Sequence, residues 1–314
     1  MKDLTVLSLF DGIACGRVAL ERAEIPVKSY IASEIEPNAI KAAMSNYPDI
    51  QQIGDVSKID TKTLPKIDLL IGGSPCQGFS ASGKGLNFVD PRSRLFFEYV
   101  RILKEVNPRY FLLENVKMRK EWSDIITEYL GVEPIEINSS TVSAQNRTRL
   151  YWTNIPGVTP PSDRGVRLED ILESAEWTQP GAIRGRRLNK GVIVGRRLNE
   201  GGHWQDYDKT IPIVQCLEVR ATNTDKSNCI TTVDKDNVLT PLPPGRYPDA
   251  FKEKLPFRYY TTKEYCRLQT LPDNYLDMIP DSQARKALGN GWTVDVIAHI
   301  LSFIKSEAEE RGEI

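Results

Sequence analysis

Residues that build metal centres and disulfide frameworks are scarce in this sequence. The 314 residues include two histidines and five cysteines, and none of the cysteines form a Cys-x-x-Cys pair. Zinc sites draw on clustered cysteine and histidine, so this composition argues against one. An odd, scattered set of cysteines also indicates a reducing compartment. We therefore expect no metal cofactor and a cytoplasmic protein.

The sequence also lacks a strong excess of positive charge and any long apolar run. Its net charge is −1, so contact with nucleic acid would have to come from local basic patches. No apolar stretch reaches the roughly 20 residues that span a membrane, and no signal-peptide pattern opens the chain. The length suits one large domain carrying a smaller lobe.

Strand-like and helix-like segments alternate along the first half of the chain. We expect an α/β fold with a mostly parallel sheet and helices on both faces. The pattern breaks from about 154 to 258, and helical segments return after 260. This organisation predicts one domain formed by 1–154 plus 259–314 and an inserted lobe at 155–258. The expected strands are 4–10, 27–33, 67–71 and 109–113, and the expected helices are 16–23, 36–47, 94–106, 262–271, 282–288 and 293–304.

The inserted segment contains a short internal repeat and a basic run. Gly185–Asn189 recurs ten residues later as Gly195–Asn199, and we interpret the two copies as strands of a hairpin. Residues 184–197 hold six arginines or lysines and no acid, which favours contact with phosphates or guanine. A solvated basic hairpin is the alternative. Residues 222–236 are a second candidate for recognition.

Cys76 follows a short apolar strand, two glycines and a proline. The run Ile67–Ile71 predicts a buried strand, and Gly72-Gly73 ends it. The thiol then lies at the strand exit, where ligands bind in open α/β sheets. Cys76 is therefore a candidate nucleophile, and a small buried hydrophobe is the alternative.

Other polar residues follow the predicted strands in the same way. Gly12 and Gly16 open the first turn with a spacing that does not fit a dinucleotide site. Glu34 ends the second strand, where a carboxylate can accept from ribose hydroxyls, and Asp55 could accept from an adenine amino group. Solvated loop acids are the alternative for either carboxylate.

Glu114 ends the strand expected at 109–113, on the edge where Cys76 should lie. Arg147 and Arg149 alternate in an extended segment and so point the same way, which suits a base carbonyl or a phosphate. The alternatives are an ordinary strand-end acid and a solvated pair of arginines on an edge strand.

Taken together, these motifs resemble those of the DNA (cytosine-5)-methyltransferases. Gly72–Ser80 is similar to the catalytic Pro-Cys-Gln motif, Glu114–Val116 to the ENV motif, and Gln145–Arg149 to the QxRxR motif. The likeness continues through Glu264–Pro272 and Ala287–Val294. It spans 4 to about 304 apart from the insertion, with some Dnmt3-like details in a chain the size of the compact bacterial and phage enzymes.

This resemblance implies a class I S-adenosylmethionine-dependent, Rossmann-like fold with an inserted target-recognition lobe. It implies S-adenosyl-L-methionine as cofactor, S-adenosyl-L-homocysteine as product, and no metal. The implied cofactor-binding residues are Phe10, Gly12, Gly16, Glu34, Ile35, Asp55, Val56, Pro75, Leu95, Asn290 and Val294.

The resemblance also implies the chemistry. The Cys76 thiolate would add to C6 of a flipped-out cytosine, and C5 would then attack the methyl group. Glu114 would supply a proton to N3, and partial burial at the sheet edge would favour its protonated form. Arg149 would hold the cytosine O2, while Arg147 would support the catalytic loop and the backbone.

The implied partner is double-stranded DNA, contacted by a loop at 80–87 and by the basic run. The DNA-binding candidates are Ser80, Ser82, Lys84, Arg186, Arg187, Arg196 and Arg197. We expect a monomer, and the existence of a cognate restriction endonuclease stays an open question. The alternatives are an RNA (tRNA) cytosine methyltransferase, as in the Dnmt2 branch, and a catalytically silent DNA-binding homologue.

Overall fold

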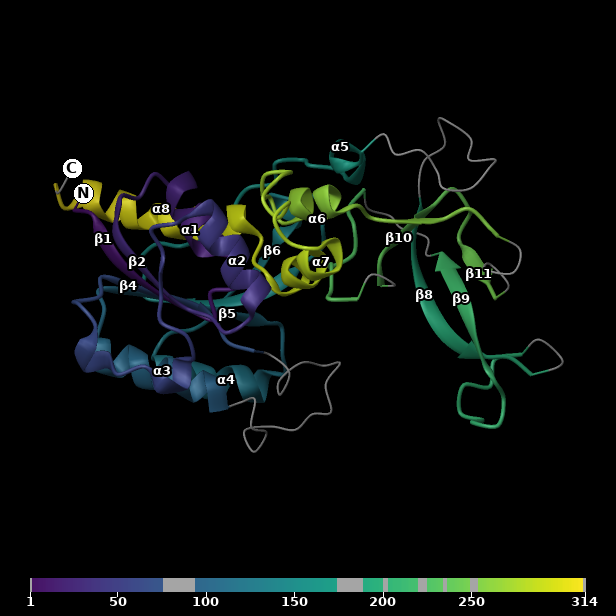
Figure 1. Ribbon diagram of the computed structural model, residues 1–314, viewed down its shortest axis with the longest axis horizontal. Coiled ribbons are helices and arrows are strands. Elements are labelled where there is room, and N and C mark those ends of the chain that lie inside the picture. The colour runs from purple at the N-terminus through teal and green to yellow at the C-terminus, as the bar shows by residue number, and fades with distance from the viewer. Residues whose placement is uncertain are drawn as a thin grey trace.

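A seven-stranded mixed sheet carries the expected α/β alternation (Figure 1). The computed structural model describes residues 2–75, 94–173, 189–199, 203–219, 225–233, 236–248 and 254–312. The strand order is β3-β2-β1-β4-β5-β7-β6. The first five run parallel, and β7 lies antiparallel to both β5 and β6. The strands are β1 (Leu4–Leu9), β2 (Val27–Ser33), β3 (Gln51–Gln52), β4 (Leu69–Gly73), β5 (Tyr110–Val116), β6 (Ile135–Asn138) and β7 (Thr148–Thr153).

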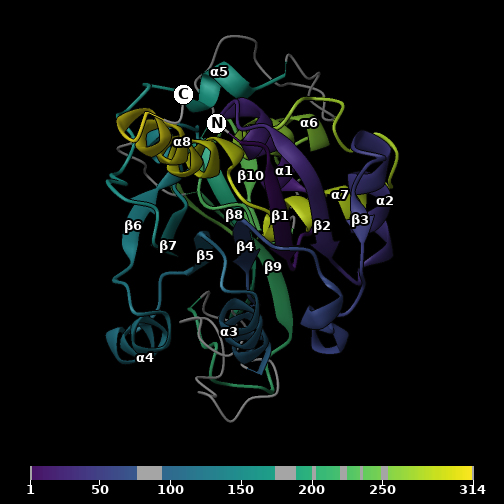
Figure 2. The same cartoon turned by 90° about the vertical axis from the view of Figure 1, so that its left-hand side faces the viewer.

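Helices cover both faces of this sheet, as Figure 2 shows from its end. One face packs on α1 (Cys15–Arg22), α2 (Pro37–Asn46) and α8 (Val294–Glu310), and the other on α3 (Arg94–Val106) and α4 (Lys120–Leu130). Successive strand residues point to opposite faces, so Val6 joins the first core and Leu7 the second. Both faces are therefore apolar, which explains the unbroken hydrophobic runs of the central strands.

A second, antiparallel sheet of five strands follows in the inserted segment. Its order is β11-β9-β8-β10-β12, and Ile193, Leu217, Val219 and Val238 form its own small core. The strands are β8 (Asn189–Arg197), β9 (Ile213–Val219), β10 (Val238–Thr240), β11 (Gly245–Tyr247) and β12 (Arg258–Tyr259).

The hairpin interpretation of the internal repeat is wrong. Residues 185–188 of the first copy lie outside the described residues, and Gly195–Arg197, the start of the second copy, pairs with Ile213–Gln215 of β9. Asn189, the last residue of the first copy, lies on the same strand β8. The local similarity therefore does not create a pairing, because β8 takes its partners from residues that come later in the chain.

Helix α5 (Leu168–Ile171) lies between the first sheet and the second, and α6 (Thr262–Leu268) and α7 (Asp281–Asn290) return the chain to the first. The 3-10 turns η1 (Val56–Lys58), η2 (Thr61–Thr63) and η3 (Ser139–Thr141) link strands within the first sheet. At the return, buried Arg258 and Glu264 form a bidentate pair with both N–O distances at 2.7 Å. Glu264 also caps α6 by accepting from the Thr261 N–H, and it accepts from the Glu173 N–H as well, so four donors surround its buried carboxylate.

Residues 225–233 bind the inserted segment to loops of the first sheet. Lys226 donates to the carbonyls of Ser140 and Ser143, and Gln145 bridges to Ser227. The end of α7 presses on the same segment, because a Cβ at Gly289 would lie 2.4 Å from the Thr231 carbonyl carbon. Only glycine allows this approach of helix to backbone.

Neither membrane spans nor metal clusters were found in the part of the chain that is described. No single helix there is long and apolar enough to cross a membrane, although the bent pair α7–α8 meets both criteria when the two are taken together. No group of three His, Cys, Asp or Glu side chains among those residues could hold a metal ion.

We expect Gly289→Ala to destabilise the protein, although alanine is the better helix former by about 1 kcal/mol. The added methyl group meets backbone atoms of Thr231 and Thr232 that no rotamer change can move. Overpacking of this kind costs about 1–3 kcal/mol, which urea unfolding would measure. Ser282→Ala, at an exposed position of the same helix, is the control. A stabilised Gly289→Ala variant would contradict the packing described here.

Candidate active site

A cavity of about 520 Å³ opens at the carboxyl ends of β1, β4 and β5. The chain passes from β1 outward to β2 and β3, then returns to β4 on the other side of β1. This reversal makes a crevice at the edge where open α/β sheets bind ligands. The wall is formed by residues 10–13, 34–36, 73–75, 114–116 and 289–292, with Cys15, Asn38, Ala39, Arg147, Arg149, Gln283, Lys286 and Ala287.

The β1–α1 turn is conformationally strained where it lines the cavity. Phe10, Gly12 and Ala14 adopt left-handed backbone angles, with φ values of 57°, 60° and 62°. Phe10 and Ala14 lack the freedom of glycine, so each costs about 1–3 kcal/mol that surrounding contacts must offset. The turn aims the Gly12 N–H at the Glu34 carboxylate, 2.8 Å away.

Glu34 is fixed by three backbone donors at the end of β2. Its Oε2 accepts from Gly12, and its Oε1 accepts from the N–H groups of Ile35 at 2.7 Å and Glu36 at 2.9 Å. The next side chain, Ile35, is 71% exposed and stands on the cavity wall. An oriented carboxylate beside an exposed apolar side chain suits a ligand with hydroxyl groups and a flat apolar ring.

Asp11 is a cavity residue that the sequence reasoning missed. Its side chain is 8% exposed, and its Oδ1 accepts from the Tyr30 hydroxyl at 2.6 Å. Its Oδ2 is buried and makes no hydrogen bond of standard geometry. Burial raises the pKa of Asp11 to about 6, although the hydroxyls of Ser8 and Tyr30 act in the opposite direction. Its only sequence signal was an acid inside the glycine turn.

Glu114 is held between two donors at the end of β5. Arg149 Nε lies 3.0 Å from its Oε1, and Trp292 Nε1 lies 3.1 Å from its Oε2. The residue is 9% exposed, so these contacts form with little competing water. Burial opposes the charged guanidinium, but the Glu114 carboxylate raises the pKa of Arg149 above its ordinary value.

Arg147 lies deeper and binds backbone instead of the carboxylate. It is 4% exposed, and its guanidinium donates to the carbonyls of Ile230 at 3.0 Å, Gly289 at 3.1 Å and Gly291 at 2.9 Å. Burial and the neighbouring Arg149 lower the pKa of Arg147. The role expected for Arg147 in supporting the catalytic loop stays a prediction, since that loop lies outside the described residues.

A second cysteine, Cys229, was also missed as a neighbour of the site. Its Sγ lies 3.4 Å from Arg147 Nη1 and 3.9 Å from Arg149 Nη2. It belongs to the 222–236 segment that the sequence suggested for recognition, and this contact brings that segment to the two arginines. No spacing rule connects residue 229 to residues 147 and 149, so only the fold shows their proximity.

The structure places the expected cofactor residues in two groups. Phe10, Gly12, Glu34, Ile35, Pro75 and Asn290 line the cavity, whereas Gly16, Asp55, Val56, Leu95 and Val294 do not. Asp55 caps η1 by accepting from Ser57, and this contact lowers its pKa. Gly16 packs tightly, since a Cβ there would lie 2.4 Å from Ile71 Cδ1. The ligand roles assigned to all these residues stay predictions.

The structure describes only some of the residues expected to bind DNA. Cys76, Ser80, Ser82, Lys84, Arg186 and Arg187 lie outside the described residues. Arg196 pairs with Glu218 and Asp206, each at 2.8 Å, and lies 6.0 Å from the Trp204 ring. The Arg197 N–H donates to Asp206 at 2.9 Å. Arg196 therefore already has two acidic partners, which the charge count of the basic run did not anticipate.

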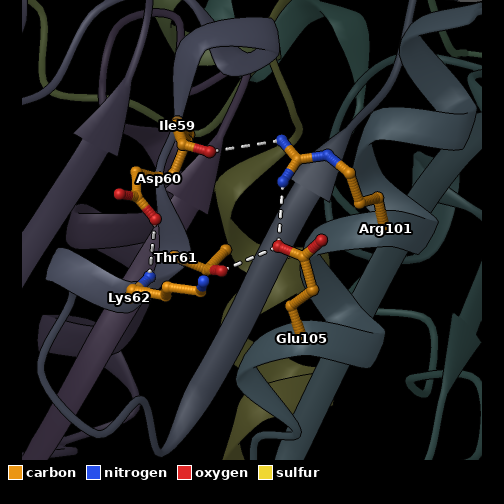
Figure 3. Close-up of a pocket in the computed structure, with 6 residues that line it drawn as sticks. All are labelled: Ile59, Asp60, Thr61, Lys62, Arg101 and Glu105. Atoms are coloured by element: carbon orange, nitrogen blue, oxygen red, sulfur yellow. Dashed lines mark hydrogen bonds and ion pairs between the residues drawn. The ribbon is translucent and has the colours of Figure 1, made fainter.

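A separate hollow of about 440 Å³ lies between η2 and α3 (Figure 3). Its charged and polar side chains already bind one another. Glu105 accepts from Arg101 at 2.9 Å and from Thr61 at 2.7 Å, while Arg101 also donates to the Ile59 carbonyl. None of the expected site residues line this hollow, and its contacts hold η2 against α3.

The strand order and the cavity together define a class I methyltransferase fold. The structure of S. pombe Dnmt2 methyltransferase superposes with a TM-score of 0.66 at 22% identity, covering 98% of this chain and 99% of that one. The C-5 cytosine-specific DNA methylase model matches residues 4–125. Type II methyltransferase M1.ScrFI of Lactococcus lactis subsp. cremoris is 32% identical over 310 residues, 93% of this chain and 75% of that protein.

A phage protein gives a shorter match. Orphan methyltransferase M.Rho11sI of Bacillus phage rho11s is 39% identical over 190 residues, which cover 56% of this chain and 35% of that protein. The similarity to the Lactococcus protein extends over nearly the whole chain, and the family model fits the N-terminal part that contains most of the cavity wall. The chain belongs to the C-5 cytosine-specific DNA methylase family.

We expect Asp11→Asn to stabilise the protein increasingly as the pH rises. The Asp11 pKa is about 6 in the folded state against 3.8 for an exposed group, so the folded protein binds more protons between these values. Wild-type stability is therefore lost as pH rises through about 6, and the variant escapes this loss. Its advantage should grow by about 1 kcal/mol between pH 5 and pH 8.

Urea unfolding at both pH values tests this expectation. The asparagine side chain of the variant keeps an oxygen that can accept from Tyr30, so the hydrogen bond survives. Asp49→Asn, at a side chain that is 64% exposed, is the matched control. An Asp11→Asn advantage that does not change with pH would mean that the carboxyl is not buried as described.

Proposed function

We propose that this protein is a DNA (cytosine-5)-methyltransferase that transfers the methyl group of S-adenosyl-L-methionine to C5 of a flipped-out cytosine. This proposal rests on the observation that one cavity is lined by Glu114, Arg147, Arg149 and Pro75. Pro75 directly precedes Cys76 in the chain. Separate strand ends thus bring an acid and two cations to one cavity, together with the residue that directly precedes the proposed nucleophile.

The cavity suits this cofactor on two observations. The unpartnered Oδ2 of Asp11 offers negative charge to a cationic ligand, and Glu34 beside exposed Ile35 suits an adenosine group. Bound S-adenosyl-L-methionine supplies an electrophilic methyl group on a positively charged sulfonium. We assign Phe10, Gly12, Glu34, Ile35 and Asn290 to direct contact, with Asp11 added to the residues expected from sequence.

The protein's own groups account for the bond changes. The Cys76 thiolate forms a bond to C6 of cytosine while Glu114 gives a proton to N3, and electron density moves to C5. C5 would gain the methyl group, leaving S-adenosyl-L-homocysteine as the thioether product. C5 would then lose its proton to a base, the C6–S bond would break to restore the thiolate and the aromatic ring, and N3 would return its proton to the Glu114 carboxylate. Arg149 holds Glu114 and faces the cavity, where it can also donate to the cytosine O2.

The second sheet is the proposed target-recognition lobe at 155–258, with 1–154 plus 259–314 as the catalytic domain. Residues 225–233 of this lobe contact Arg147 at the cavity wall. This contact supports a model in which the lobe binds a DNA duplex while the target base is flipped into the cavity. Some relatives are named as type II and others as orphan methyltransferases, so a restriction endonuclease partner is a separate proposal. We further propose a cytoplasmic monomer.

We expect Cys76→Ala to abolish methylation and to leave cofactor binding intact, because alanine has no nucleophile. The purified protein is incubated with unmethylated genomic DNA and S-adenosyl-L-methionine, and 5-methylcytosine is mapped at base resolution. Cys216→Ala, in the small sheet, is the matched control. Methylation by Cys76→Ala would disprove the nucleophile. Absence of methylation in the wild type would disprove the DNA reaction and direct the assay to tRNA.

The arginines of the basic run should contribute unequally to the affinity for DNA. Replacing Arg186, Arg187, Arg196 and Arg197 by alanine should weaken binding and flatten its salt dependence, by about 0.9 in log–log slope for each lost phosphate contact. Arg196→Ala alone should change the slope less, because Glu218 and Asp206 already bind that guanidinium. Fluorescence anisotropy at several salt concentrations measures both. An unchanged slope in the fourfold variant would exclude the run from the interface.

A further inference from the structure

Trp292 connects the wall of the cavity to the catalytic carboxyl. It lies between α7 and α8, and its indole Nε1 donates to Glu114 Oε2 at 3.1 Å. The ring also lies against the end of β4, since a Cβ at Gly73 would lie 2.8 Å from Nε1. Glycine at 73 is therefore what allows the indole to reach the carboxyl.

Hydrogen bonds from buried side chains hold the backbone of the turn that carries Trp292. The Gly291 carbonyl accepts from Arg147 Nη2 at 2.9 Å and from Gln269 Nε2 at 3.0 Å. On the other side, Thr293 Oγ1 donates to Gln269 Oε1 at 2.8 Å. With the backbone held on both sides of residue 292, the indole has little freedom to turn away from Glu114.

Glu114 is thereby held by one cation and one neutral donor. Arg149 binds Oε1 and Trp292 binds Oε2, so rotation of the carboxyl would break both contacts. The neutral N–H of Trp292 fixes the carboxyl without adding a second positive charge beside it, which suits a group that must carry a proton to its substrate.

We propose that Trp292 is a positioning residue for Glu114, acting through its indole N–H, with Arg147 and Gln269 holding it in place. This inference rests on the proposed methyltransfer reaction. A misplaced acid slows proton transfer without weakening the binding of either substrate. Trp292 should therefore affect kcat far more than the KM for DNA or for S-adenosyl-L-methionine.

The first test is Trp292→Phe, which removes the N–H and keeps an aromatic ring in the turn. We expect kcat to fall roughly ten-fold, the size of one lost hydrogen bond to a charged group, with both KM values within about three-fold. Trp152→Phe is the matched control, because it removes an indole N–H that donates to Thr127 in the buried core. Thermal melts verify that both variants are folded.

A double-mutant cycle with Glu114→Gln separates positioning from other roles. If Trp292 acts through Glu114, Trp292→Phe should have little further effect in the Glu114→Gln background, measured by single-turnover methylation with excess enzyme. An equal loss in both backgrounds would overturn the inference. So would an unchanged kcat, or a weakened cofactor affinity by calorimetry with kcat retained. A wild type without methylation would instead refute the proposed function itself.

Discussion

The buried guanidinium of Arg147 is the interaction on which the site depends. Its hydrogen bonds reach the carbonyls of Ile230, Gly289 and Gly291, which lie in two chain segments far from Arg147 in sequence. A cation removed from water needs full compensation, and here backbone dipoles supply it. The cavity edge of the sheet, residues 225–233 and the α7–α8 turn are therefore joined at one charged group.

The division of labour between the two neighbouring arginines follows from strand geometry. Residues 147 and 149 point to the same side of an extended segment, but Arg147 lies just before β7 and Arg149 lies inside it. Arg149 is opposite Val116 in the register, which brings its guanidinium to Glu114. Arg147 lies outside the strand, and its guanidinium binds backbone carbonyls of neighbouring segments instead. Arg149 thus contacts the Glu114 carboxylate, and Arg147 holds the surrounding backbone.

Much of the first sheet could be predicted from sequence because its signals are local. Apolar runs bounded by glycine or proline gave the central strands, and polar residues directly after them marked the cavity edge. Pairings in the second sheet could not be obtained this way, since β8 finds β9 across a long loop and the repeated pentapeptide is not a pairing signal. Asp11, Cys229 and Trp292 acquire their surroundings from distant segments, so no spacing rule could have identified their contacts.

The attachment of residues 225–233 has a consequence for how such proteins diversify. This segment bonds to loops of the first sheet through Lys226, Ser227 and Ile230, and it lies in close contact with Gly289. The small sheet, by contrast, has a hydrophobic core of its own. An exchange of the small sheet for another domain would therefore have to retain residues 225–233 as part of the host and replace only the sheet itself. The boundary of the exchanged segment would therefore lie inside the insertion, and not at its two ends.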